Sequence, residues 1–281
     1  MKINTLVIVG VGLIGGSIAL AARRRGVAAR VVGVDRQPDA LERALRDGLL
    51  DGAYSHLAAA AGLADLLVFC TPVDNIAAQV IESAASCRPG TLLTDAGSTK
   101  AAIVREVRGR LPAGVEFVGS HPLAGSEKHG PAHASAHLLE GRLVVVTPEP
   151  DTTDNTLSQI RDFWTALGAR VQVMDADEHD RALALTSHLP HLLSSALAGI
   201  LPPELYDLTA TGFRDTTRLA AGQPALWSAI FRANQTHLLA SLDRLDEQLR
   251  RFRDALLQGD QAALEALLQQ GKQVRDDLSH R

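Results

Sequence analysis

Three closely spaced glycines near the start of the chain limit its fold more than any other feature. Gly10, Gly12 and Gly15 follow a β-branched apolar run at residues 6–9 and precede a helical pattern at residues 18–25. The first glycine permits a tight turn, the second lets a pyrophosphate approach the backbone, and the third allows close packing of helix on strand. The pattern predicts a dinucleotide-binding β-α-β unit.

An acidic residue at the end of the next predicted strand supports this interpretation. Asp35 follows a strand expected at residues 30–34 and lies 20 residues after Gly15, where a carboxylate accepts hydrogen bonds from ribose hydroxyls. Its charge repels a 2′-phosphate and favours NAD over NADP, although Arg36 offsets part of that repulsion. A glycine turn without a ligand is the alternative. We expect NAD to contact Gly10, Gly12, Leu13, Ile14, Gly15 and Asp35.

The composition argues against several classes of function. A chain of 281 residues, 46% hydrophobic and 21% charged, is typical of a globular protein with two domains. The net charge of -4 argues against a nucleic-acid partner, because phosphate binding depends on clustered positive charge. The 2 cysteines make no disulfide framework or metal-ligand pattern, which favours the cytoplasm. The uncharged stretch at residues 3–22 is broken by glycines, so we expect no membrane partner.

The chain divides into two regions of different periodicity. Residues 1–175 alternate strand and helix patterns, which predicts a parallel sheet covered on both faces, and residues 176–281 carry only helical patterns. The predicted fold is therefore an α/β Rossmann-type domain followed by an all-α domain. A homodimer interface on the helical domain is one interpretation of its Leu- and Ala-rich stripes, and an ordinary helical subdomain is the other. The predicted strands are 6–9, 30–34, 66–70, 92–94, 116–118, 143–146 and 170–173, and the later helices are 183–201, 224–257 and 261–278.

Two glycine-containing loops after predicted strands carry chemical groups. One contains Ser98 and the other contains His121, and loops at the carboxyl ends of parallel strands bind ligands in α/β proteins. His121 is a candidate general base because the ordinary pKa of histidine lies near neutral pH. The alternatives are a structural role for this histidine and a helix-capping role for Ser98.

Five motifs together resemble the prephenate/arogenate dehydrogenase family. They are VGVGLIGGSIA (9–19), DAGSTK (95–100), SHPLAGSEKHG (120–130), SHLPH (187–191) and GFRDTTR (212–218). HPLAGSE is the most specific of them, and the set covers nearly the whole chain. The resemblance implies an NAD-dependent enzyme of tyrosine biosynthesis that oxidises and decarboxylates prephenate to 4-hydroxyphenylpyruvate, with a helical domain that dimerises.

The resemblance also implies roles for individual residues. His121 is the base or hydrogen-bond acceptor, Ser98 helps to hold the substrate hydroxyl and the imidazole, and Arg218 binds a carboxylate. The residues expected to contact substrate are Arg218, His191, Ser126, Glu127 and Trp227, with Glu127 paired to Arg218 at the pocket mouth.

Several alternatives stay open. Arg218 and Asp215 are three residues apart and could form a surface helix pair. His188 and His191 could be half of a metal site, but no further ligands accompany them, so we expect no metal. The substrate could instead be arogenate, or both compounds. A β-hydroxyacid dehydrogenase would need an Asn-x-x-Lys pair that 234–237 lacks, and an NAD-sensing dimer would not need His121, Ser98 and Arg218 together.

Overall fold

The computed structural model describes residues 3–124 and 130–279. They form two compact units, Met1–Gln235 and Thr236–Arg281. The domain boundary expected at residue 175 lies inside the first unit. Division of the chain into a cofactor domain and a substrate domain at that residue stays a prediction.

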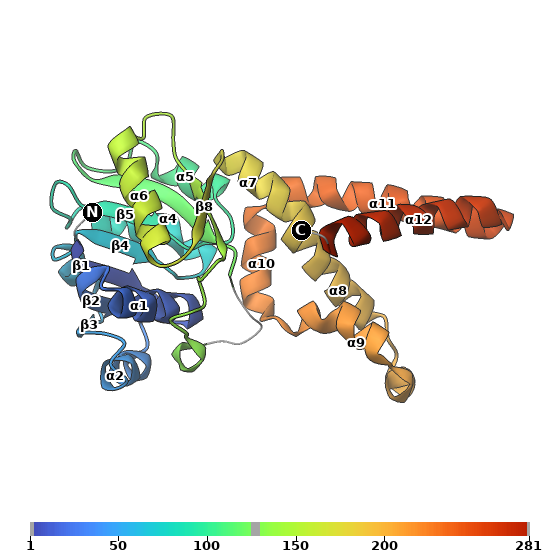
Figure 1. Cartoon of the computed structure of the whole chain (residues 1–281), viewed down its shortest axis with the longest axis horizontal. Helices are drawn as coiled ribbons and strands as arrows, with labels where there is room; N and C mark the ends of the chain where they lie inside the picture. Colours follow the sequence, from blue (N-terminus) through green and yellow to red (C-terminus); the bar gives the residue numbers. More distant parts are fainter. Residues whose placement is uncertain (1–2, 125–129, 280–281) are drawn as a thin grey trace. The chain divides into compact units, whose positions relative to one another are not determined.

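A single sheet lies at the centre of the first unit (Figure 1). Over the described residues it has 8 strands in the order β3-β2-β1-β4-β5-β6-β7-β8. Seven of these strands match predicted ones, whereas the short β3 shows no alternation that sequence analysis could detect. The strands are β1 (Ile3–Val9), β2 (Ala28–Val34), β3 (Gly52–Tyr54), β4 (Leu66–Phe69), β5 (Leu92–Asp95), β6 (Glu116–Pro122), β7 (Leu143–Thr147) and β8 (Arg170–Val173).

The sheet is mixed, which corrects the expectation of a wholly parallel sheet. Strands β1 to β6 pair in parallel, but β7 pairs antiparallel to β6, and β8 pairs parallel to β7. In its described part, the β6–β7 connection holds only the short 3-10 turn η1 (Pro131–His133) and no crossover helix. Because a parallel pair needs a crossover, the chain returns in the opposite direction.

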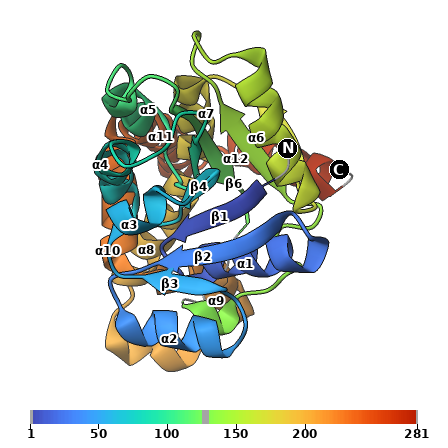
Figure 2. The same cartoon turned by 90° about the vertical axis from the view of Figure 1, so that its left-hand side faces the viewer.

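Helices cover both faces of the sheet (Figure 2). Ile18 and Trp164 pack with Leu6 on one face, and Ile76 and Val80 belong to the core on the other. The first face carries α1 (Leu13–Arg25), α2 (Pro38–Arg46) and α6 (Asp154–Ala166). The second face carries α3 (Leu57–Ala61), α4 (Val73–Ala84) and α5 (Ala101–Val107).

Residues 176–233 add helices to the same unit. Asp175 caps the first of them by accepting hydrogen bonds from the N–H groups of Asp177 and Glu178. The helix predicted at 183–201 contains a π-helical turn, a feature that often marks a functional site. The elements are α7 (Ala176–Leu183), η2 (Ala184–His188), α8 (Leu189–Gly199), η3 (Pro203–Leu208), α9 (Thr211–Thr217), η4 (Arg218–Ala221) and α10 (Pro224–Ala233).

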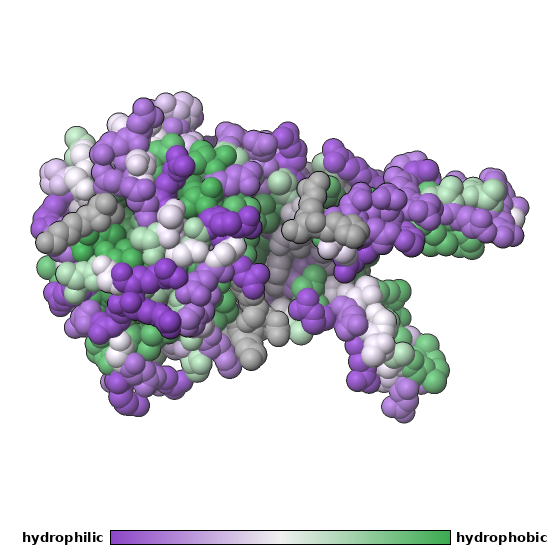
Figure 3. All heavy atoms as spheres, viewed as in Figure 1, coloured by the Kyte–Doolittle hydropathy of each residue, from purple (hydrophilic) through white to green (hydrophobic). Residues whose placement is uncertain are grey.

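The helix predicted at 224–257 is broken at Asn234, because this side chain donates hydrogen bonds to the carbonyl of Asp180 and to Nδ1 of His188. The second unit consists of α11 (Gln235–Gln258) and α12 (Gln261–Ser279). Figure 3 shows hydrophobic side chains among hydrophilic ones along these helices. No helix in the described part of the chain is long and apolar enough to cross a membrane.

Candidate active site

A pocket of about 360 Å³ lies where the parallel strands β1, β4 and β5 end. It brings together Gly12 of the glycine loop and Ser98, which are 86 residues apart in the sequence. Gln223 and Leu226, from the region of α10, line the same pocket. Residues on both sides of the predicted boundary at 175 therefore contribute to one cavity.

The glycines have the geometry that a bound dinucleotide requires. Gly10 has a φ of +93°, which favours glycine. A Cβ at Gly15 would lie 2.1 Å from the carbonyl oxygen of Gly10, so only glycine lets α1 pack this closely on β1. A Cβ at Gly12 would meet nothing within 4 Å, because Gly12 faces the open pocket beside Leu13 and Ile14. This space at the N-terminus of α1 fits a pyrophosphate.

Asp35 lies directly after β2, beside the glycine loop. Its carboxylate accepts hydrogen bonds from the N–H groups of Val11, at 2.9 Å, and Gln37, at 3.0 Å. Each bond goes to a different oxygen, and a carboxylate oxygen can accept a second hydrogen bond. The two backbone contacts fix the orientation of the carboxylate, and its remaining acceptor capacity fits the hydroxyls of a ribose.

His121 lies within β6, not in the loop that the sequence predicted, because this strand extends to Pro122. The side chain is 9% exposed, and its Nδ1 lies 2.9 Å from Nε2 of His179. Burial, with the nearby His179 and Lys100, holds the pKa of His121 well below its ordinary value of 6.5. The imidazole is therefore neutral at pH 7 and can accept a proton.

A buried ion pair fixes the backbone next to His121. Lys100 pairs with Asp95 and also donates a hydrogen bond to the carbonyl of Ser120, at 2.9 Å. Asp95 accepts hydrogen bonds from the N–H groups of Ser120 and Gly97. Burial lowers the pKa of Lys100, and the neighbouring Asp95 opposes that effect. Sequence analysis did not select this pair, although both residues belong to the DAGSTK motif.

Ser98 does not cap α5, so the capping alternative is wrong. The N-cap residue is Lys100, and the N–H groups of Lys100 and Ala101 donate to the carboxylate of Asp180, at 2.7 and 2.9 Å. Ser98 instead lines the pocket that contains Gly12. Its expected contact with His121 stays a prediction.

The predicted substrate residues His191 and Trp227 lie together. Their rings stack with centroids 3.5 Å apart at an angle of 16°. Phe231 contacts both rings, and Gly222 lies so close to them that any side chain there would overlap them. Burial lowers the pKa of His191, which favours a neutral ring in this stack. Trp227 thus belongs to an aromatic cluster, whose contact with substrate stays a prediction.

The remaining predicted substrate residues are Arg218, Ser126 and Glu127. Arg218 begins η4, next to α9, and its side chain is exposed. Ser126 and Glu127 lie outside the described residues, so the pair expected between Glu127 and Arg218 stays a prediction. Among the described residues, no group of three or more His, Cys, Asp or Glu side chains could hold a metal ion.

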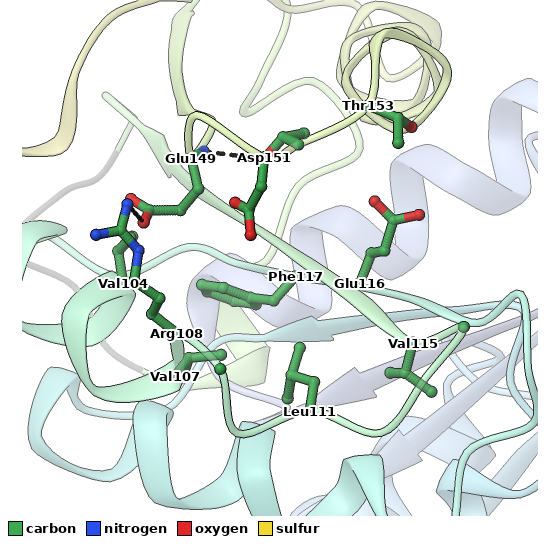
Figure 4. Close-up of a pocket in the computed structure, with 13 residues that line it drawn as sticks. Val104, Val107, Arg108, Leu111, Val115, Glu116, Phe117, Glu149, Asp151 and Thr153 are labelled. Carbon is green, nitrogen blue, oxygen red and sulfur yellow. Dashed lines mark hydrogen bonds and ion pairs between the residues drawn. The ribbon is translucent and has the colours of Figure 1, made fainter.

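A second pocket, of about 400 Å³, lies beside the amino end of β6 (Figure 4). Its apolar wall includes Leu111 and Phe117, and on its rim Arg108 pairs with Glu149. None of the predicted site residues that the structure describes lines this pocket. The pocket at the glycine loop is therefore the candidate active site.

Comparisons with known proteins agree on one family. Residues 18–173 match the model of the prephenate dehydrogenase nucleotide-binding domain, and residues 175–270 match that of the prephenate dehydrogenase dimerization domain. The chain is 33% identical to a cyclohexadienyl dehydrogenase of Zymomonas mobilis, over 91% of this chain and 89% of that one. It is 32% identical to a prephenate dehydrogenase of Bacillus subtilis, over 98% of this chain and 76% of that one.

A solved structure is similar throughout. It is a prephenate dehydrogenase of A. aeolicus in complex with hydroxyphenyl propionate and NAD+, with a TM-score of 0.93 and 28% identity over 99% of both chains. A 3-hydroxyisobutyrate dehydrogenase of Salmonella typhimurium, at 15% identity and a TM-score of 0.53, shares only the fold.

Proposed function

The chain belongs to the prephenate dehydrogenase family, and from this membership we propose that it oxidises and decarboxylates prephenate to 4-hydroxyphenylpyruvate with NAD. The observation that carries the proposal is the open space at Gly12, in the same pocket as Ser98. Next to Gly12, the N–H of Val11 donates to the carboxylate of Asp35, the expected ribose ligand. Asp35 also supports NAD over NADP, because its charge repels a 2′-phosphate.

The chemistry needs a hydride acceptor, a base and a cation. NAD, when bound, accepts the hydride that leaves the carbon bearing the ring hydroxyl. His121 takes the hydroxyl proton, because burial keeps its imidazole neutral. The ring carboxylate leaves as CO2, its bonding electrons complete the aromatic ring, and the ring oxygen takes the proton back from His121. Arg218 holds a carboxylate of the substrate, for which a planar guanidinium is suited.

The aromatic cluster of His191 and Trp227 supports a role in substrate binding. A flat, largely apolar surface suits a ring that becomes aromatic during the reaction. Ser98 lines the cofactor pocket, which supports the proposal that its hydroxyl holds the hydroxyl of the substrate. Ser126 and Glu127 complete the proposed set on the basis of the HPLAGSE motif alone.

Arogenate is a second candidate substrate. The similarity to a cyclohexadienyl dehydrogenase favours it, since that enzyme's name covers more than one substrate of this ring type. Prephenate and arogenate differ only in a keto or an amino group on the side chain. In the proposed binding mode, the preference for prephenate or arogenate therefore depends on protein contacts to the substrate's keto or amino group, and not on His121.

We also propose that the protein acts as a homodimer through its helical region. The matched dimerization-domain model supports this, as do exposed leucines on both helices of the second unit. These are Leu239, Leu249, Leu256, Leu257, Leu268 and Leu278. Light scattering after size exclusion should give twice the chain mass of 29.9 kDa. The cytoplasmic location stays a prediction.

A turnover assay tests the proposed function. Purified protein is mixed with prephenate or arogenate and with NAD or NADP, and reduced cofactor is followed at its absorbance maximum. The proposal expects the highest kcat/KM with prephenate and NAD, and 4-hydroxyphenylpyruvate as product. A clear preference for arogenate would establish the second candidate, and no turnover with either substrate would refute both.

A further inference from the structure

A chain of hydrogen bonds leads from His121 into the protein interior. Nδ1 of His121 lies 2.9 Å from Nε2 of His179, and Nδ1 of His179 lies 2.8 Å from a carboxylate oxygen of Asp180. His121 comes from β6, whereas His179 and Asp180 are neighbours on α7. His179 and Asp180 are fully buried, so water does not compete for these bonds.

Asp180 is held firmly at the end of this chain. Its two oxygens accept hydrogen bonds from the backbone N–H groups of Lys100 and Ala101, at the start of α5. Its own carbonyl accepts a hydrogen bond from the side chain of Asn234, at 2.6 Å. Contacts from the start of α5 therefore hold the carboxylate of Asp180, and the contact from Asn234, at the end of α10, holds its main chain.

The positions of the protons follow from the order of the groups. A carboxylate only accepts hydrogen bonds, so Nδ1 of His179 must carry a proton. Nε2 of a neutral His179 is then an acceptor, which requires a proton on Nδ1 of His121. The lone pair of His121 consequently lies on Nε2, the ring nitrogen that is not committed to His179.

We propose that His179 and Asp180 are positioning residues that hold His121 in the tautomer with a basic Nε2. The proposal rests on the proposed function, in which His121 accepts the hydroxyl proton of the substrate. When Nε2 takes up that proton, the positive charge of the His121 imidazolium is stabilised through His179 by the carboxylate of Asp180. The same arrangement of a base oriented by a second and a third group serves nucleophilic enzymes.

Other charges near His121 act against protonation. After burial, a charge on His179, Lys100 or His188 lowers the pKa of His121, and Lys100 is itself paired with Asp95. In this proposal, the carboxylate of Asp180, at the end of the hydrogen-bond chain, is the group that stabilises an imidazolium at His121. Loss of the His179 link should therefore affect the rate of proton uptake more than the binding of substrate.

Two substitutions at one position test this role. His179→Leu removes both ring nitrogens, whereas His179→Gln keeps a carbonyl acceptor and an N–H donor. We expect His179→Leu to lower kcat by about 10²-fold, within the range of a positioned acid or base, with KM for prephenate and Kd for NAD changed less than about threefold. The kcat of His179→Gln should be at least about tenfold higher than that of His179→Leu. The acid limb of the pH–kcat profile should shift in the Leu variant relative to the wild type.

Ile160→Val is the matched control, because it removes one buried methylene from the core at a fully buried position of α6 without touching the hydrogen-bond chain. A kcat in His179→Leu within threefold of the wild type, or an equal loss in the Gln and Leu variants, would overturn the proposal. Thermal unfolding of all three variants shows whether a loss of rate follows a loss of structure.

The tautomer can be measured without turnover. In ¹⁵N-labelled wild-type protein, the His121 imidazole should show a protonated Nδ1 and an unprotonated Nε2, with His121→Asn used to assign the signals. An Nε2-protonated His121 would refute the positioning role, even if the enzyme oxidises prephenate. Conversely, the expected tautomer in a protein that does not oxidise prephenate would leave the hydrogen-bond chain intact and refute the proposed function alone.

Discussion

Adding one methyl group at Gly12 or at Gly15 should separate cofactor binding from packing. At Gly15 the new Cβ would lie 2.1 Å from the carbonyl oxygen of Gly10 and 2.9 Å from Cγ2 of Ile8. The first neighbour is backbone, so no rotamer change relieves the overlap, and α1 must shift by roughly 1 Å to restore van der Waals contact. Such overpacking costs about 1–3 kcal/mol.

Gly12→Ala should have little effect on stability, because its Cβ would meet nothing within 4 Å and Gly12 makes no side-chain cap that could be lost. We expect a cost below about 1 kcal/mol. The methyl group would, however, occupy the space through which a pyrophosphate approaches the start of α1. The Kd for NAD should rise about 10- to 100-fold, or roughly 1.4–2.8 kcal/mol.

The assay combines thermal unfolding without cofactor and calorimetric titration with NAD. Gly15→Ala should lower Tm by about 2–12 °C, and Gly12→Ala by no more than about 4 °C. Gly199→Ala is the control, since its Cβ would also meet nothing within 4 Å and it lies on α8, away from the glycine loop. Wild-type NAD affinity in Gly12→Ala would show that the start of α1 is not the pyrophosphate site.

Substitutions at four further positions test other parts of the site and the fold. Asp35→Ser should raise the kcat/KM ratio of NADP to NAD, and better use of NADP by the wild type would contradict this role. His121→Asn should lower kcat by about 10²–10⁴ with NAD binding retained, and activity within a few-fold of the wild type would remove His121 from the mechanism. Arg218→Ala should raise KM for prephenate roughly 10- to 100-fold, with partial rescue by Arg218→Lys, whereas an unchanged KM would make Arg218 a surface residue. Burial lowers the pKa of His188 to about 4 from 6.5, so the unfolded chain binds a proton first as pH falls. Stability should then drop by about 3 kcal/mol between pH 6.5 and 4, and denaturant unfolding of His188→Gln should show a smaller drop than the wild type.

The sequence predicted the features that have a local signal. Short β-branched apolar runs and the glycine spacing are properties of neighbouring residues, and they located β1, β2 and the turn around Gly10. The family motifs selected His121, Ser98 and Arg218, whose roles are now proposed.

Features that depend on contacts between distant segments could not be predicted. The partner of His121 is His179, 58 residues away, and nothing around His179 marks it as an active-site residue. The antiparallel direction of β7 goes with a β6–β7 connection whose described part holds no crossover helix, and the residues of the strand itself do not predict it. Likewise, Asn234 breaks a helix because of bonds to Asp180 and His188, which lie 54 and 46 residues before it.

The position of Asp180 has a consequence for how this protein can be recombined. A residue of α7, beyond the end of the nucleotide-binding domain model at 173, accepts the hydrogen bonds that cap α5, a helix packed on the sheet. A chimera joined near residue 175 would receive α5 from one parent and its cap from the other. A working chimera therefore needs a second parent with an acidic residue at the position of Asp180. Otherwise α5 and α7 must be taken together from the same parent.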